Sequence, residues 1–160
     1  MSNPVDQAAV TVQRADILSP MAQALIEALN AELSKVYPEE GACHFRLDAN
    51  EVRNGNGAFL IAFRSSTPVG CGAVRRIDVN TGELKRMYVV SGERGRGVGQ
   101  AILKALETEA KGLRLTRLVL ETGVRQDRAQ KLYAQAGFSQ IDPYGEYTNS
   151  PLSICMAKEL

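Results

Sequence analysis

Apolar residues recur along the chain at two different spacings, which predict helices and strands. The first helical stripe consists of Leu25, Ile26, Leu29, Leu33 and Val36. This helix should begin at Ser19-Pro20, because serine caps helix N-termini and proline fits the first turn. It should end near Tyr37, because Pro38 disfavours helical backbone in the residue before it.

Further helices and a series of strands follow from the same patterns. Apolar residues at helical spacing predict helices over residues 98–111 and 127–136, which stop at Gly112 and Gly137. A short helix is expected over residues 48–53. Strands are expected over residues 10–14, 58–64, 69–77, 83–90, 117–122, 138–141 and 152–157.

The order of these elements predicts the fold class. Short turns between residues 58 and 90 favour hairpins, and the helix over 98–111 then forms a crossover to the next strand. We therefore expect an α/β (α+β) fold with a central mixed, mostly antiparallel sheet of about six to seven strands and helices on both faces. The length suits a single domain over residues 1–160.

Composition narrows the classes of function. The formal net charge is +1, without the basic excess of a nucleic-acid-binding protein, so no nucleic-acid partner is expected. The three cysteines are widely spaced, which predicts free thiols in a reducing compartment, with neither a disulfide framework nor a zinc site. The first seven residues do not resemble a signal peptide, and no stretch has membrane-spanning length. These features predict a cytoplasmic protein with no metal and no membrane partner.

Residues 83–100 read as a strand, a glycine-rich turn and the start of a helix. Glycines permit left-handed backbone and close approach of a ligand, and Arg94 and Arg96 add permanent positive charge. A helix N-terminus offers backbone N–H groups without an intrahelical partner. The stretch therefore predicts a phosphate or pyrophosphate site.

The spacing within this stretch indicates which phosphate site it is. It lacks the Gly-Lys-Ser/Thr of a P-loop, and its alternating glycines do not fit the dinucleotide fingerprint. Arg94, Gly97 and Gly99 form the pattern Arg-x-x-Gly-x-Gly. This pattern resembles the pyrophosphate loop of the GNAT superfamily of N-acetyltransferases, which bind acetyl-CoA. Residues 87–89 and 129–138 also resemble superfamily hallmarks, and the first half of the chain matches by its pattern of elements.

The resemblance implies acetyl-CoA as the acyl donor and suggests how it is held. Backbone groups of residues 87–89 would pair with the pantetheine arm, with the N–H of Val89 facing the thioester carbonyl. Gln126 stands where many members carry asparagine, so that contact is either made by the longer amide or lost. The cofactor-binding residues implied by the resemblance are Met87, Tyr88, Val89, Arg94, Gly95, Arg96, Gly97, Val98, Gly99, Gln126, Ala129 and Tyr133.

Two residues are candidates for the proton transfers. The resemblance implies Tyr133 as the general acid that protonates the departing thiolate; the alternative is a tyrosine packed on an apolar helix face. Glu83 resembles the glutamate base of the histone-acetylating branch. Strand alternation would place residues 83, 85, 87 and 89 on one face. The alternatives are an ion pair of Glu83 with Lys85 or Arg86, and deprotonation relayed by water.

The chain is thus expected to be an acetyl-CoA-dependent N-acetyltransferase, in which a primary amine of a small-molecule or amino-acid-like acceptor attacks directly. A protein lysine or N-terminal acetyltransferase and a non-catalytic coenzyme A-binding module stay open. Arg75, Arg76 and Arg86 either pair with a substrate carboxylate or form a solvated basic face. His44, in the loop over residues 38–46, either lines the acceptor pocket or lies on the surface. A homodimer is one assembly that the sequence leaves open.

Overall fold

The computed structural model describes residues 8–39 and 47–160. Its α-helices are α1 (Pro20–Val36), α2 (Val98–Gly112) and α3 (Asp127–Gln135), with 3₁₀ helices η2 (Ala49–Val52), η3 (Ser91–Glu93) and η4 (Gly145–Tyr147). The strands are β1 (Val10–Arg14), β2 (Gly57–Arg64), β3 (Thr67–Arg76), β4 (Thr81–Val89), β5 (Arg117–Gly123), β6 (Ser139–Ile141) and β7 (Ser153–Glu159). The elements agree with the predicted ones, and most ends differ by one or two residues.

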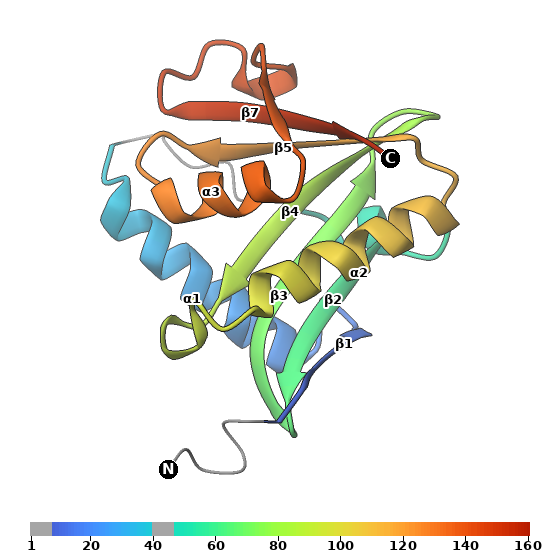
Figure 1. Ribbon diagram of the computed structural model, residues 1–160, viewed down its shortest axis with the longest axis vertical. Coiled ribbons are helices and arrows are strands. Elements are labelled where there is room, and N and C mark those ends of the chain that lie inside the picture. Colours follow the sequence, from blue (N-terminus) through green and yellow to red (C-terminus); the bar gives the residue numbers. More distant parts are fainter. Residues whose placement is uncertain (1–7, 40–46) are drawn as a thin grey trace.

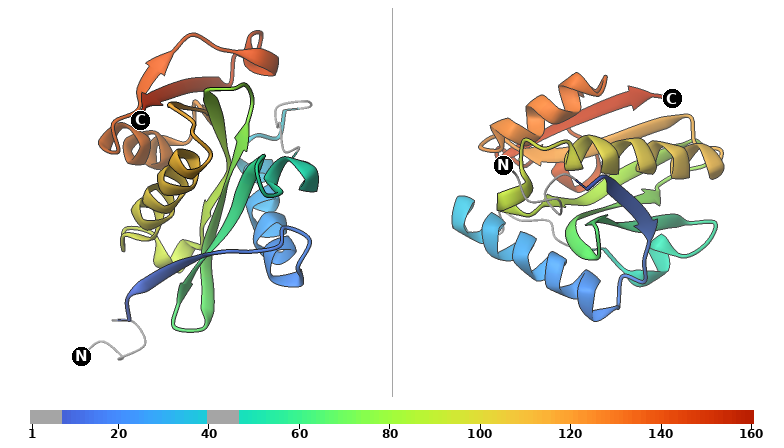
Figure 2. Two further views of the ribbon diagram at one scale, coloured as in Figure 1. Left: turned by 90° about the vertical axis from the view of Figure 1, so that its right-hand side faces the viewer. Right: turned by 60° about the horizontal axis from the view of Figure 1, so that its bottom comes forward.

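Seven strands form one sheet in the order β1-β2-β3-β4-β5-β7-β6. The strands β4 and β5 pair in parallel, joined by the crossover helix α2, and the other neighbours pair antiparallel. Helices α2 and α3 cover one face of the sheet, and α1 and η2 cover the other (Figures 1 and 2). The predicted mixed, mostly antiparallel sheet with helices on both faces is confirmed.

Each face of the sheet has its own apolar core. On the face of α2 and α3, residues such as Leu84, Ile102, Leu106 and Leu118 are buried together. On the face of α1 and η2, the core includes Ile26 and other residues of α1, together with neighbouring side chains of β2 and β3. Because apolar burial contributes most of the favourable free energy of folding, these two cores fix the helices against the sheet.

Helix α1 is held at both ends. The Ser19 hydroxyl accepts a hydrogen bond from the backbone N–H of Ala22 at 3.2 Å, as expected of a helix cap. At the other end, the Tyr37 hydroxyl accepts a hydrogen bond from the backbone N–H of Arg125 at 2.9 Å. Arg125 also lies over the Tyr37 ring, 5.1 Å from its centroid. The end of α1 is therefore fastened to the turn between β5 and α3.

The two parallel strands separate before they end. Their pairing runs from Thr81 opposite Arg117 to Leu84 opposite Leu120. Beyond these positions β4 continues to Val89 and β5 to Gly123 without pairing to each other, and Figure 1 shows them running apart. The separation leaves one edge of β4 open in the middle of the sheet.

A bulge changes the direction of side chains along β4. The register against β3 shifts between Cys71 and Ala73, and Arg86 has a φ of 59°. A bulge of this kind places two residues of one strand opposite one residue of the other. After it, Met87 packs against the core on the α2 face, whereas Tyr88 packs against the core on the α1 face.

The predicted alternation over positions 83, 85, 87 and 89 is therefore wrong. Glu83 lies on the α1 and η2 face, where Arg75 links it to Glu51 of η2. Met87 and Val89 instead pack against the core on the α2 face. The extra residue at the bulge reverses the alternation, and the sequence gives no sign of it, because arginine is not a residue that favours positive φ.

Candidate active site

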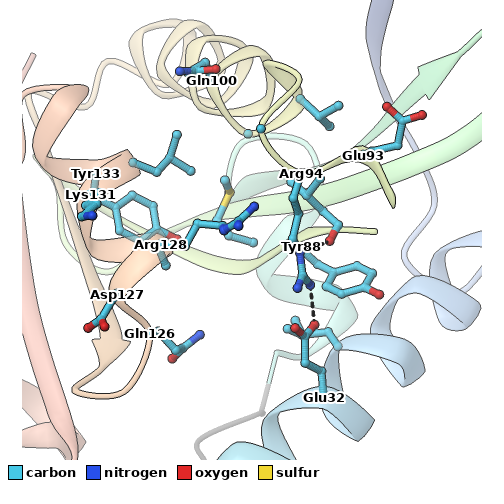
Figure 3. Close-up of a pocket in the computed structure, with 18 of the residues that line it drawn as sticks. Glu32, Tyr88, Glu93, Arg94, Gln100, Gln126, Asp127, Arg128, Lys131 and Tyr133 are labelled. Atoms are coloured by element: carbon cyan, nitrogen blue, oxygen red, sulfur yellow. Dashed lines mark hydrogen bonds and ion pairs between the residues drawn. The ribbon is translucent and has the colours of Figure 1, made fainter. Parts of the chain in front are cut away.

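A large cleft of about 800 Å³ opens where β4 and β5 separate. Its walls are the end of β4, the loop before α2, the start of α2, and helix α3, with α1 on the far side (Figure 3). Of the residues predicted to bind the cofactor, those that line this large cleft are Met87, Tyr88, Val89, Arg94, Gly95, Gly97, Val98, Gly99, Gln126, Ala129 and Tyr133. Arg96 does not line it; its guanidinium lies 3.5 Å from the carboxylate of Glu93.

The glycine-rich loop has the backbone that a phosphate site requires. Gly95 and Gly97 have φ values of 77° and 86°, in the left-handed region that favours glycine. Gly97 is the N-cap of α2, and no side chain caps that helix end. The first N–H groups of α2 therefore face the large cleft without a side-chain partner, and they carry the positive end of the helix dipole. An anion at this place would be bound by backbone N–H groups.

The open edge of β4 presents backbone groups to the same cleft. The N–H of Val90 donates to the carbonyl of Val69 on β3 at 3.0 Å. Because N–H groups of successive strand residues point to opposite sides, the N–H of Val89 points away from β3, toward the open edge. The carbonyl of Val89 accepts a hydrogen bond from the Nε of Arg94 at 3.0 Å. An extended ligand beside β4 would thus meet the Val89 N–H.

Arg94 connects the loop with two other elements. Its Nη2 lies 2.6 Å from the Oε2 of Glu32 on α1, and its guanidinium lies over the Tyr88 ring at 5.9 Å (Figure 3). The hydrogen bond and charge of Glu32 raise the pKa of Arg94 above its ordinary value. The contacts show that Arg94 positions the loop against α1 and β4, whether or not it also binds a phosphate.

Tyr133 of α3 lines the large cleft. It also lines a small chamber of about 90 Å³ between β4 and β5, whose walls include Lys85, Arg86, Glu121 and Tyr147. The Tyr133 side chain is 5% exposed, and no described residue makes a hydrogen bond with its hydroxyl. Burial, with the Glu121 carboxylate nearby, raises the pKa of Tyr133 above its ordinary value. The phenol therefore stays protonated at neutral pH, as a proton donor must.

Gln126 has a structural contact as well as a place in the cleft. Its Oε1 accepts a hydrogen bond from the backbone N–H of Gly123 at 2.8 Å. This contact closes the turn between β5 and α3, and the Nε2 of Gln130 donates to the Gly123 carbonyl at 2.8 Å. The geometry uses the oxygen of the Gln126 amide and leaves its NH₂ group as the part that could contact a ligand.

Glu83 lines neither the large cleft nor the small chamber. It is 1% exposed, and its two carboxylate oxygens accept hydrogen bonds from the Nε of Arg75 at 2.8 Å and the hydroxyl of Tyr144 at 2.5 Å. Glu83 thereby joins β3, β4 and the segment after β6. A base role for Glu83 stays a prediction, and it would need a relay through another group. Arg75 and Arg76 are held by Glu51 and Glu83 and by the carbonyls of residues 79 and 113.

The large cleft contains side chains that the sequence analysis missed. Arg128 and Lys131 of α3 line it, and neither makes an ion pair with any residue within 8–39 or 47–160 (Figure 3). Glu32 and Gln100 also line it. Arg128 and Lys131 are three residues apart and so share one face of α3, a helical spacing that could have identified them beside Ala129.

Some of the predicted features lie outside the described residues. These are Cys43, His44 and most of the loop over residues 38–46. The other two cysteines, Cys71 and Cys155, are buried free thiols. The described part of the chain contains no group of three His, Cys, Asp or Glu side chains placed to hold a metal ion. None of its helices is long and apolar enough to span a membrane.

Known proteins resemble this chain over most of its length. Residues 22–138 match the family described as "Acetyltransferase (GNAT) family". IAA acetyltransferase from Azospirillum brasilense is 40% identical over 153 residues, which cover 94% of this chain and 98% of that protein. A Klebsiella pneumoniae structure described as an acyl-CoA N-acyltransferase has a TM-score of 0.81 and 29% identity, covering 96% and 99%. A GNAT family acetyltransferase from Elizabethkingia anophelis, with acetyl-CoA bound, has a TM-score of 0.68 and 21% identity, covering 94% and 98%.

Proposed function

Since the chain belongs to the acetyltransferase (GNAT) family, we propose that it transfers the acetyl group of acetyl-CoA to a primary amine of a small molecule, by direct attack of the amine on the thioester. The 40% identity to a protein named IAA acetyltransferase supports a small acceptor. A structural neighbour with acetyl-CoA bound supports the donor. The single-domain organisation, the cytoplasmic location and the homodimer stay predictions.

One observation carries the proposal. A single cleft contains both the open edge of β4 and the uncapped N-terminus of α2. The diphosphate of acetyl-CoA would lie at the N–H groups of residues 95–99, and its pantetheine arm would extend along β4 toward Tyr133. Arg128 and Lys131 supply positive charge to the same cleft. The cleft volume of about 800 Å³ lies within the range of sites that bind small molecules and cofactors.

We infer a role for one group of the protein at each end of the reacting thioester. The Val89 N–H would donate to the thioester carbonyl, whose oxygen gains negative charge as the amine attacks. A donor in such a position lowers the barrier by about 3–4 kcal/mol in known cases. The Tyr133 hydroxyl would give its proton to the sulfur as the carbon–sulfur bond breaks.

The two other candidate functions differ from this one, the first in its acceptor and the second in having no catalytic activity. A protein lysine or N-terminal acetyltransferase would need to admit a peptide, and a coenzyme A-binding module would bind without turnover. No observation in the described residues favours either. Acetylation of peptides in preference to small amines would establish the first, and tight acetyl-CoA binding with no turnover on any amine would establish the second.

The test combines a binding measurement with a turnover measurement. Calorimetric titration with acetyl-CoA should show one site per chain. Release of free thiol should then be followed with a panel of small amines, amino acids and short peptides. We expect acceptor-dependent thiol release with one group of small amines. A protein that neither binds acetyl-CoA nor releases thiol with any acceptor would contradict the proposal.

A further inference from the structure

The small chamber is a second cavity that Tyr133 lines, beside the large cleft. The large cleft and the small chamber adjoin each other, because they share five lining residues: Leu29, Leu33, Met87, Gln126 and Tyr133. The chamber lies in the gap between β4 and β5, beyond the point where their pairing ends. A group held in this chamber would therefore meet a thioester that lies along β4 near Tyr133.

One wall of the chamber is cationic. Lys85 and Arg86 line it from the bulge of β4, where Arg86 has the unusual φ of 59°. The Nη1 of Arg86 donates to the Oδ1 of Asn30 on α1 at 3.0 Å, which orients the guanidinium. Burial lowers the pKa of both Lys85 and Arg86, so both cations are partly removed from water. A partly desolvated guanidinium is a strong partner for a carboxylate.

The opposite wall carries a carboxylate. Glu121 of β5 lines the chamber, and its Oε2 accepts a hydrogen bond from the Ser153 hydroxyl at 2.6 Å. Tyr133 and Tyr147 line the same chamber. Burial raises the pKa of both phenols, and the charge of Glu121 adds to the increase. Glu83, the glutamate predicted from the sequence, lines neither cavity. Glu121 is thus a carboxylate at the place where the acceptor amine and the acid Tyr133 would meet.

We propose that the small chamber binds the acceptor as an amino carboxylate, with Arg86 holding its carboxylate and Glu121 taking the first proton from its ammonium group. This assignment rests on the proposed acetyl transfer. The two walls present opposite charges across about 90 Å³, which suits a compound whose amine and carboxylate are only a few atoms apart. A lysine side chain of a protein would bring no carboxylate to Arg86.

The proton balance follows from this arrangement. Glu121 takes one proton from the ammonium group and passes it to solvent, which leaves a neutral amine. The amine lone pair forms the carbon–nitrogen bond at the thioester carbon, and the carbon–sulfur bond breaks. Tyr133 gives its proton to the departing sulfur. The nitrogen then loses a second proton, which returns Tyr133 to its protonated form. The products are an amide, free coenzyme A and one proton.

The first experiment needs no variant. The kcat/KM for an amino acid should be compared with that for its carboxamide, which keeps the amine and removes the negative charge. We expect the amino acid to be preferred by a factor of about ten or more. Arg86→Gln should remove this preference, and Arg86→Lys should restore part of it. The control is Arg53→Gln, at an exposed arginine outside both cavities, which should keep the preference.

The second experiment separates a base from a structural group. Glu121→Gln should lower kcat by about a hundredfold or more at pH 7. The deficit should shrink as the pH approaches the pKa of the acceptor's ammonium group, near 10, because much of the amine is then already neutral. A purely structural defect would not depend on pH in this way. Calorimetric titration with acetyl-CoA should give unchanged affinity for both variants, which shows that the large cleft is intact.

The outcomes distinguish this inference from the proposed function. Acetyl-CoA binding with efficient acetylation of carboxamides, polyamines or peptides, and no preference for a free carboxylate, would overturn the inference and leave the transferase intact. A pH-independent loss in Glu121→Gln would overturn the base role. Absence of acetyl-CoA binding in the unaltered protein would instead overturn the proposed function.

Discussion

The substitution Gly97→Ala tests whether the backbone of the loop, rather than its side chains, forms the diphosphate site. Gly97 has a φ of 86°, and a Cβ built there would meet only the Gln100 Oε1, at 3.7 Å. That distance is an ordinary contact, so the new methyl group clashes with nothing. The substitution therefore acts through backbone conformation alone.

The cost can be estimated from the left-handed conformation. An L-residue other than glycine pays about 1–2 kcal/mol to adopt it. If the free protein keeps the conformation, its free energy of unfolding falls by this amount and the affinity for acetyl-CoA is unchanged. If the free loop relaxes, stability is kept and the affinity falls, by a factor of about 5–30. The sum of the two losses should therefore be about 1–2 kcal/mol, whichever way it divides.

Both quantities can be measured on the same preparation. Denaturant unfolding gives the change in stability, and calorimetric titration gives the change in acetyl-CoA affinity. Gly92→Ala is the matched control, because Gly92 lies just before the same loop, has ordinary backbone and would place its Cβ in open space. It should lose neither quantity. Full stability and full affinity in Gly97→Ala, or equal losses in Gly92→Ala, would refute the reasoning.

Four further predictions concern single side chains. Tyr133→Phe should lower kcat by about 10²–10⁴-fold and leave the acetyl-CoA affinity unchanged. Thermal stability should not fall, because no described residue hydrogen-bonds to the Tyr133 hydroxyl. Unchanged turnover would exclude Tyr133 as the acid. Since its pKa is raised by burial, with Glu121 nearby, the pH–rate profile of the unaltered protein should show no alkaline loss from Tyr133 below about pH 10. Arg128→Gln and Lys131→Gln should each weaken acetyl-CoA binding by up to about fivefold and reduce its salt dependence. The control is Arg114→Gln on the exposed surface, which should do neither. Equal effects of all three substitutions would contradict a role of Arg128 and Lys131 in acetyl-CoA binding. Glu83→Gln should cost about 1.5–3 kcal/mol of stability in denaturant unfolding while the pH–rate profile keeps its shape, whereas a changed profile would support Glu83 as the base.

Local signals in the sequence were sufficient to predict the helices, the strands and the glycine-rich loop. Ser19 and Pro20 mark the start of α1, and the alternating glycines mark the turn before α2, because each of these residues favours a particular local backbone. The side-chain placement around Glu83 was not predictable in the same way. It depends on the bulge at Arg86 and on Tyr144, which is 61 residues away in sequence. Such contacts arise from tertiary packing and leave no local pattern.

The same reason explains why Glu121 was overlooked. In the sequence it is a polar residue near the end of an apolar strand, the position of many solvent-facing side chains. Only the separation of β4 and β5 beyond Leu84 and Leu120 turns that position into the wall of a cavity. To predict that Arg128 and Lys131 line the large cleft, it would have been enough to know that α3 lies beside the glycine-rich loop.

The central claim is that the open edge of β4 and the N-terminus of α2 together hold one acetyl-CoA molecule. A crystal structure of the protein with acetyl-CoA tests it most directly. The account predicts diphosphate oxygens within hydrogen-bond distance of the backbone N–H groups of residues 95–99, and the acetyl carbonyl facing the N–H of Val89 beside Tyr133. A diphosphate bound elsewhere, or a thioester that does not approach β4, would contradict it.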